Sequence, residues 1–157
     1  MYLPAGELHA YFNGVGIELM ANSDNVLRGG LTGKHIDVTE LMAVTKFRTE
    51  TVCKVKPVRR GTCETVYPTP AREFLLSMIS VSKNEAYVSS HDRSVEILIC
   101  VEGKTGINDL GSGKTLPFTK GKSVVVPSGA PRYLIDGTGT IYKASVPCAP
   151  SFSGEKC

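Results

Sequence analysis

The sequence contains no tryptophan, and aromatic side chains make up only 7% of its 157 residues. It also lacks a long apolar run: the longest, Ile97 to Val101, is far shorter than the roughly 18 residues that a membrane-spanning helix needs. The first seven residues show no basic segment followed by an apolar one, so we expect neither a signal peptide nor a membrane partner. With 41% hydrophobic and 21% charged residues, the chain is a folded protein of one large or two small domains.

The charge pattern gives little sign of a nucleic-acid partner. Eighteen basic and 15 acidic residues leave a net charge of +3. The densest basic stretch, Lys54 to Arg60, contains no aromatic residue, whereas nucleic-acid-binding surfaces usually combine basic and aromatic side chains. We interpret this stretch as a solvated linker or surface rather than a nucleic-acid-binding patch.

The five cysteines do not form a recognisable pattern. They stand at positions 53, 63, 100, 148 and 157, and their spacings match no zinc or redox motif. We therefore expect reduced thiols in a cytoplasmic protein. Cys100 lies in the most apolar run and should be buried.

Short apolar segments separated by turn signals predict a mostly β fold, an antiparallel barrel or sandwich. Turn signals stand at Glu102-Gly103, Gly111-Ser112-Gly113, Lys120-Gly121, Ser128-Gly129 and Asp136-Gly137. The expected strands are Val15–Met20, Phe74–Val81, Val95–Val101, Ser123–Pro127, Tyr133–Ile135 and Thr140–Val146.

One short helix is predicted from about residue 38 to 45. Asp37 can cap it, Glu40 follows three residues later as in a capping box, and Leu41, Met42 and Val44 provide an apolar face. The stretch from Arg48 to Glu64 is interpreted as a crossing segment, part linker and part edge strand. We place the domain boundary after residue 46, between a polar, glycine-rich part (1–46) and a self-contained β-domain (47–157).

The segment Gly111-Ser112-Gly113-Lys114-Thr115 departs from the phosphate-binding loop that it superficially matches. That motif requires glycine five residues before the Gly-Lys pair, where Asn108 stands. It also requires a helix to follow, whereas Leu116-Pro117-Phe118 is expected to be extended. We predict a hairpin turn instead.

Chemically capable side chains are concentrated between residues 4 and 34. Polar loops held by a rigid sheet are common positions for binding and catalytic residues. The residues concerned are His9, Tyr11, Glu18, Asp24, Asn25, Arg28 and Lys34.

Two of these residues have alternative interpretations. His9 can serve as a metal ligand after a turn, but one histidine is not a site, and taken by itself His9 is better interpreted as a surface or hydrogen-bonded histidine. Arg28 lies between Leu27 and Gly29, where an arginine suits an anionic substrate. Alternatively, it pairs with Asp24, four residues earlier.

The segment Tyr2–Lys34 closely resembles the end of the catalytic domain of type I mannose-6-phosphate isomerases. The elements His9-Ala-Tyr11 and Ser23-Asp-Asn-Val-Leu-Arg-Gly-Gly-Leu-Thr32 carry the resemblance, which continues through Asp37–Phe47. Glu96–Gly103 and Gly121–Gly129 resemble the two halves of a cupin barrel, the C-terminal domain of the same enzymes. The resemblance therefore implies a cupin-type jelly roll and an aldose-ketose isomerase.

That family interconverts mannose 6-phosphate and fructose 6-phosphate with one zinc ion, through an enediol formed by a proton shift between C1 and C2. By position, His9 matches the fourth zinc ligand. Arg28 matches the active-site arginine, which stabilises negative charge on the intermediate. The implied cofactor is zinc, and the implied substrate is a phosphorylated hexose.

The resemblance also implies substrate-pocket positions. Tyr11, Glu18, Asp24 and Lys34 match them. Glu18 and Asp24 would handle a proton or orient Arg28, and Lys34 would contact the substrate phosphate.

The chain departs from the family pattern in two places. Gly33 stands where the family usually has proline, which would loosen the loop before Lys34. The other three zinc ligands of the family, a Gln, a His and a Glu, belong to an earlier segment that is absent here. We therefore expect a C-terminal fragment that needs the missing upstream catalytic segment and is inactive alone.

Compared with metal-binding cupins, the β-domain also lacks a set of metal ligands. His91 is alone rather than in a His-x-His pair, and Arg132 stands where metal-binding cupins carry histidine. We expect this barrel to be structural or to carry an accessory surface. A non-catalytic cupin that binds sugar or has a regulatory role remains the alternative function.

Overall fold

The computed structural model describes residues 1–23, 26–47 and 54–147. The chain divides into two units, Met1–Val55 and Lys56–Lys156. No helix within the described ranges is both long and apolar enough to cross a membrane.

The described part of Lys56–Lys156 forms one antiparallel sheet of eight strands, which confirms the mostly β prediction. The strand order is β1-β2-β3-β8-β5-β6, with β4 also on β8 and β7 also on β5. The two ends of this order do not pair with each other, so the sheet stays open, as in a jelly roll. The strands are β1 Val58–Arg60, β2 Glu64–Tyr67, β3 Leu75–Val81, β4 Tyr87–Val88, β5 Glu96–Asp109, β6 Thr115–Thr119, β7 Ser123–Val126 and β8 Tyr133–Ser145.

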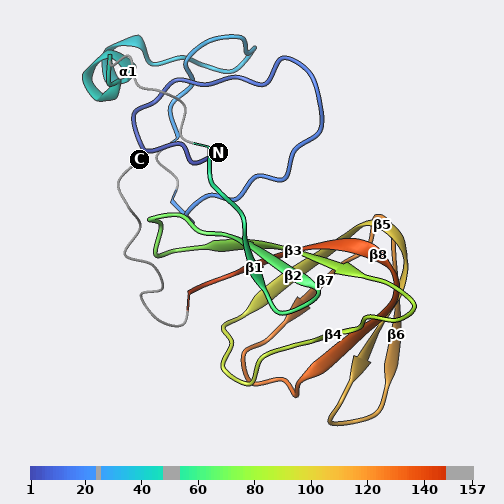
Figure 1. Cartoon of the computed structure of the whole chain (residues 1–157). Coiled ribbons are helices and arrows are strands. Elements are labelled where there is room, and N and C mark those ends of the chain that lie inside the picture. Colours follow the sequence, from blue (N-terminus) through green and yellow to red (C-terminus); the bar gives the residue numbers. More distant parts are fainter. Residues whose placement is uncertain (24–25, 48–53, 148–157) are drawn as a thin grey trace. The chain divides into compact units, whose positions relative to one another are not determined.

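Two long strands, β5 and β8, run side by side through this sheet (Figure 1). Each changes its outer neighbour along its length: β5 pairs first with β7 and then with β6, and β8 first with β4 and then with β3. A bulge in β5 lies between Cys100 and Glu102. Strands that bend and change partners at bulges let one ladder fold over into two layers around a core.

The turns expected at Glu102-Gly103 and Asp136-Gly137 are wrong, because both sequences lie inside long strands. Gly103 pairs with Gly139 at the point where β5 and β8 bend. Gly103 has a φ of 88°, and a Cβ there would lie 2.1 Å from the carbonyl oxygen of Thr138. Glycine here permits a close backbone approach within a bend rather than a chain reversal. For the same reason, the two strands expected at 133–135 and 140–146 are one strand, β8.

Three of the other strand predictions are confirmed. β3, β7 and the start of β5 lie where the sequence places them. β1 is the edge strand expected between residues 48 and 64, although residues 48–53 of that stretch lie outside the described residues. β2, β4 and β6 were not among the expected strands.

A hairpin joins β5 to β6, as predicted for the Gly-Ser-Gly-Lys-Thr segment. The Asp109 carboxylate accepts hydrogen bonds from the backbone N–H of Gly111 (2.8 Å) and the hydroxyl of Ser112 (2.7 Å). The backbone N–H of Asp109 donates to the carbonyl of Lys114 (2.8 Å). The hydrogen bonds from the Ser112 hydroxyl and the Gly111 N–H lower the pKa of the Asp109 carboxyl. An extended strand rather than a helix follows, so the segment is not a phosphate-binding loop.

Within the described residues, every buried side chain belongs to the second unit. The apolar core lies between the bent halves of the sheet. Cys100 is buried there as a free thiol, as predicted, and so is Cys63. The core cluster comprises Cys63, Ile79, Val81, Tyr87, Leu98, Cys100, Ile107, Phe118, Val126, Tyr133, Ile135 and Ile141.

The described part of the first unit consists of loops and one helix, α1 Val38–Val44. Asp37 caps α1 as predicted: its Oδ1 accepts a hydrogen bond from the N–H of Glu40 (3.0 Å). No residue of α1 is buried. The strand expected at Val15–Met20 is wrong: this apolar segment is irregular, and a β conformation needs a neighbouring strand for its backbone groups.

Candidate active site

A shallow groove of about 330 Å³ lies in the first unit, between the segments 7–10 and 27–31. The segments approach each other at Gly29, where a Cβ would lie 2.6 Å from Cδ2 of Leu8. Glycine at this position therefore permits the contact. The lining residues are Glu7, Leu8, His9, Ala10, Leu27, Gly29, Gly30 and Leu31.

His9 lines this groove and is exposed. Its Nδ1 lies 3.1 Å from the backbone carbonyl oxygen of Glu7, so Nδ1 carries the proton in that hydrogen bond. The lone pair then resides on Nε2, which is the arrangement that a metal-binding histidine usually has. His9 is both a hydrogen-bonded surface histidine and one that can ligate.

Tyr11 lies next to His9, and Glu18 lies next to Tyr11. The rings of His9 and Tyr11 meet edge to face, with centroids 6.0 Å apart. Slight burial and the adjacent Glu18 carboxylate, which hydrogen-bonds the phenol, raise the pKa of Tyr11. The phenol therefore stays protonated at neutral pH and can donate a hydrogen bond.

Arg28 stands between two groove residues, Leu27 and Gly29, and is exposed. The backbone that follows it is unusual: Gly30 has a φ of 132° and Leu31 a φ of 51°. Leu31 is the sole non-glycine residue with positive φ within the described ranges. Left-handed backbone at a non-glycine residue is costly and is concentrated at functional sites.

The remaining candidates are not brought into the groove. Glu18 and Lys34 are exposed and do not line it. The backbone N–H of Lys34 donates to the hydroxyl of Thr32 (3.2 Å). Asp24 and Asn25 lie outside the described residues, so the alternative pairing of Arg28 with Asp24 stays open.

The described residues do not assemble a complete metal site. Within 1–23, 26–47 and 54–147, no three His, Cys, Asp or Glu side chains are grouped so that they could hold a metal ion. His9 fits as a single zinc ligand by its tautomer and exposure. A catalytic zinc needs three protein ligands, so the residues described here do not by themselves fit the ion.

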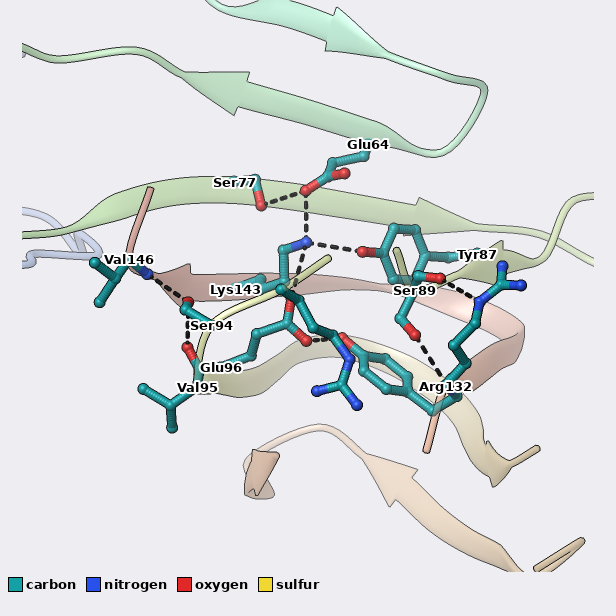
Figure 2. A network of polar contacts seen from close by, with 12 residues as sticks. Glu64, Ser77, Tyr87, Ser89, Ser94, Val95, Glu96, Arg132, Lys143 and Val146 are labelled. Carbon is teal, nitrogen blue, oxygen red and sulfur yellow. Dashed lines mark hydrogen bonds and ion pairs between the residues drawn. The ribbon is translucent and has the colours of Figure 1, made fainter. Parts of the chain in front are cut away.

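The second unit contains a buried polar network that the sequence analysis did not single out (Figure 2). Lys143 lies at its centre, in contact with Glu64, Glu96 and Tyr87. The alternation of buried and exposed residues along the strands could have identified this network from the sequence. Glu96 has the parity of buried Leu98 and Cys100, and Lys143 the parity of buried Ile141.

The pKa values of Lys143, Tyr87 and Tyr133 in this network are all raised. Burial by itself would lower the pKa of Lys143, but Tyr87 and Glu64 outweigh burial and raise it. Burial also raises the pKa of Tyr87, as well as that of Tyr133, where Tyr87 and Glu96 add to the shift. The lysine is an ammonium and both phenols are protonated at neutral pH.

Arg132 and His91 come together on the second unit. The guanidinium of Arg132 lies 3.0 Å from Nε2 of His91 and donates through Nε to the carbonyl of Ser89 (2.9 Å). The lone histidine is therefore engaged by an arginine.

The bent antiparallel sheet and its core are those of a cupin domain, and a family model for "Mannose-6-phosphate isomerase, cupin domain" matches residues 63–146. The mannose-6-phosphate isomerase of Escherichia coli K12 is 36% identical over 143 residues, which cover 90% of this chain and 35% of that relative. Mannose-6-phosphate isomerase 2 of Arabidopsis thaliana is 32% identical over 128 residues, which cover 82% of this chain and 29% of the plant protein.

A solved structure gives the same result. The mannose 6-phosphate isomerase of Salmonella typhimurium, bound to its substrate and to zinc, matches with a TM-score of 0.68 at 32% identity, over 81% of this chain and 32% of that one. The chain belongs to the mannose-6-phosphate isomerase family. It spans about a third of the length of the curated relatives that it matches.

Proposed function

We propose that this chain provides part of the active site of a cytoplasmic mannose-6-phosphate isomerase. The observation that carries the proposal is the groove at which His9 meets the Arg28-bearing segment, in a chain 36% identical to the Escherichia coli enzyme over 143 residues. The free thiols of Cys63 and Cys100 support a reducing compartment.

Each candidate residue has a role that its chemistry supports. His9 would supply one zinc ligand through Nε2, and the other ligands would come from polypeptide outside this chain. Arg28 would stabilise the negative charge that develops on the substrate oxygens as the proton moves between C1 and C2, because an exposed guanidinium offers several donors in a fixed plane. Tyr11 would donate a hydrogen bond from its protonated phenol.

The candidate residues that do not line the groove would bind the substrate or orient other side chains. Lys34 would contact the phosphate of the hexose as a point charge. Glu18 and Asp24 would hold a proton or orient Arg28. Because the described residues form no complete metal group, the chain alone would be inactive.

A chimera tests this proposal. The matching C-terminal third of the Escherichia coli enzyme is replaced by this chain, and zinc content and isomerase activity are measured beside the 157-residue chain alone. We expect zinc and activity in the chimera and neither in the chain alone. A folded chimera that binds zinc but lacks activity would favour a non-catalytic cupin module instead.

Substitution of His9 tests the ligand assignment within the chimera. His9→Ala should reduce the zinc content well below one ion per chain, because a ligand is lost. Tyr11→Phe is the matched control, since it keeps the ring against His9 and should retain the ion. Stoichiometric zinc in the His9→Ala protein would remove His9 from the ligand set.

A further inference from the structure

The side chain of Lys143 enters the interior of the β-domain from the middle of the sheet. The residue lies on β8 between β3 and β5 and is 6% exposed. An unpaired ammonium in such a place would be strongly unfavourable, because an apolar interior does not replace its hydration.

Three oxygens from three other strands surround the ammonium. Nζ lies 2.8 Å from Oε1 of Glu64, 2.7 Å from the hydroxyl of Tyr87 and 3.4 Å from Oε1 of Glu96. These residues stand on β2, β4 and β5. An ammonium has three N–H donors, so this set of oxygens matches its donors in number.

A second group of hydroxyls fixes the two carboxylates. Ser77 donates to Oε1 of Glu64 (2.8 Å), and Tyr133 donates to Oε2 of Glu96 (2.8 Å) (Figure 2). Both carboxylates are nearly inaccessible, with Glu64 6% and Glu96 3% exposed. The carboxylates are thus oriented by partners of their own, as the ligands of a bound ion usually are.

The centre of the domain therefore has the composition of a site for a hard cation. Its donors are carboxylate and hydroxyl oxygens, which are the types that such cations prefer. Two carboxylates require a positive charge, and Lys143 is the one that touches both. Arg93 instead lies over the Tyr133 ring, at 5.8 Å from its centroid.

We propose that Lys143 is a built-in cation, whose ammonium occupies an all-oxygen cation site in the interior of the β-domain. The chain thereby supplies, through a covalently attached side chain, one positive charge that the two carboxylates share, and this side chain keeps metal ions out of the site. Shortening this side chain opens the site to a divalent cation such as Mn²⁺.

The alternative is that Lys143 matters only because its aliphatic stem fills space. The two accounts differ in what the carboxylates do. A built-in cation makes the effect of losing Lys143 depend on Glu64 and Glu96, whereas a space-filling stem makes it independent of them. Replacing a buried ion pair as a whole is often neutral, whereas removing one partner is strongly destabilising.

Charge removal with rescue tests the first part of the proposal in the full 157-residue chain. Lys143→Met keeps the apolar stem, and we expect it to lower the Tm by more than about 12 °C. Adding Glu64→Gln and Glu96→Gln in the same chain should recover at least half of that loss. The control is Lys104→Met, at an exposed lysine on β5, which should leave the Tm unchanged. A Lys143→Met protein as stable as this control, or a triple variant no more stable than Lys143→Met, would overturn the proposal.

Metal binding tests the second part. Lys143→Ala leaves both carboxylates and vacates the position of the ammonium, so Mn²⁺ should raise its Tm and bind at one ion per chain by calorimetry. The wild type and Lys104→Ala should show neither effect. A Lys143→Ala chain that Mn²⁺ neither stabilises nor refolds would refute the cation site, as would equal Mn²⁺ binding by the wild type.

Discussion

At the scale of the residue, a charged side chain in the β-domain is buried or exposed according to the face of the sheet on which it stands, and the bulge between Cys100 and Glu102 shifts the alternation of buried residues along β5. Lys104 and Lys143 are both strand lysines, yet Lys104 is exposed and Lys143 is enclosed by Glu64 and Tyr87. The enclosed lysine is stabilised as an ammonium because acceptors from other strands converge on it. Its titration is therefore linked to folding.

This linkage predicts loss of stability at alkaline pH. The pKa values of Lys143, Tyr87 and Tyr133 are all raised in the folded state, from reference values of 10.5 for lysine and 10.0 for tyrosine. The folded chain then binds more protons than the unfolded chain above about pH 10, so the free energy of unfolding falls as pH rises, and the contribution is fully present below that pH.

Thermal unfolding between pH 7 and pH 11 measures the effect. Tyr133→Phe removes one of the groups with a raised pKa, so the alkaline slope of its Tm should be shallower than that of the wild type. Equal slopes would show that Tyr133 is not part of the linkage.

Arg28 gives a kinetic prediction at the same scale. In the chimera, Arg28→Ala should lower kcat by about 10²–10³, with a much smaller change in KM, because the charge that Arg28 meets develops in the transition state. Arg72→Ala, at an exposed arginine of the β-domain, is the control and should leave kcat unchanged. Normal turnover in the Arg28→Ala enzyme would remove Arg28 from the mechanism.

At the scale of the element, the bend of β5 and β8 depends on glycines in close contact. Gly103 and Gly121 have nearly the same backbone angle, with φ of 88° and 86°. A Cβ on Gly103 would lie 2.1 Å from the carbonyl oxygen of Thr138, whereas a Cβ on Gly121 would meet nothing within 4 Å. Comparing Gly103 with Gly121 therefore distinguishes the energetic cost of the left-handed backbone from the cost of the steric contact.

Alanine substitution at these two glycines tests the bend. Gly121→Ala should cost about 1 kcal/mol, from the left-handed backbone alone. Gly103→Ala should cost at least about 2 kcal/mol more, because the contact with β8 must also shift. Urea unfolding of the two variants measures the difference, and equal losses would show that the bend tolerates a methyl group.

At the scale of the whole molecule, the two units differ in what stabilises them. The second unit contains every buried residue within the described ranges. The first unit exposes large apolar side chains such as Phe12 (91%), Val15 (103%) and Leu31 (85%). A unit in which no described side chain is fully buried has little to offset the entropy of ordering its backbone.

We therefore predict that residues 56–157 fold independently. This piece should unfold cooperatively, with a Tm within about 3 °C of that of the full chain, because the core is unchanged. Residues 1–55 alone should show no cooperative transition by circular dichroism. A noncooperative 56–157 piece would show that the first unit contributes to the stability of the core.

The amino-acid sequence by itself determined the features that depend on local patterns. Alternating apolar residues and turn signals predicted β3, β7 and the hairpin after Asp109, and the Asp37 cap predicted α1. Each of these features is marked by a pattern of residues that are close together in the sequence. The resemblance in residues 2–47 also placed His9 and Arg28 as site residues, and their roles stay predictions.

Only the tertiary structure decided the features that depend on distant residues. It showed that Gly103 and Gly137 mark bends inside long strands, because their close contacts come from the partner strand. It also showed that residues 15–20 do not form a strand, since no neighbour pairs with them in the described part of the chain. The ammonium of Lys143 meets oxygens that lie from 47 to 79 positions away along the chain, and only folding brings such groups together.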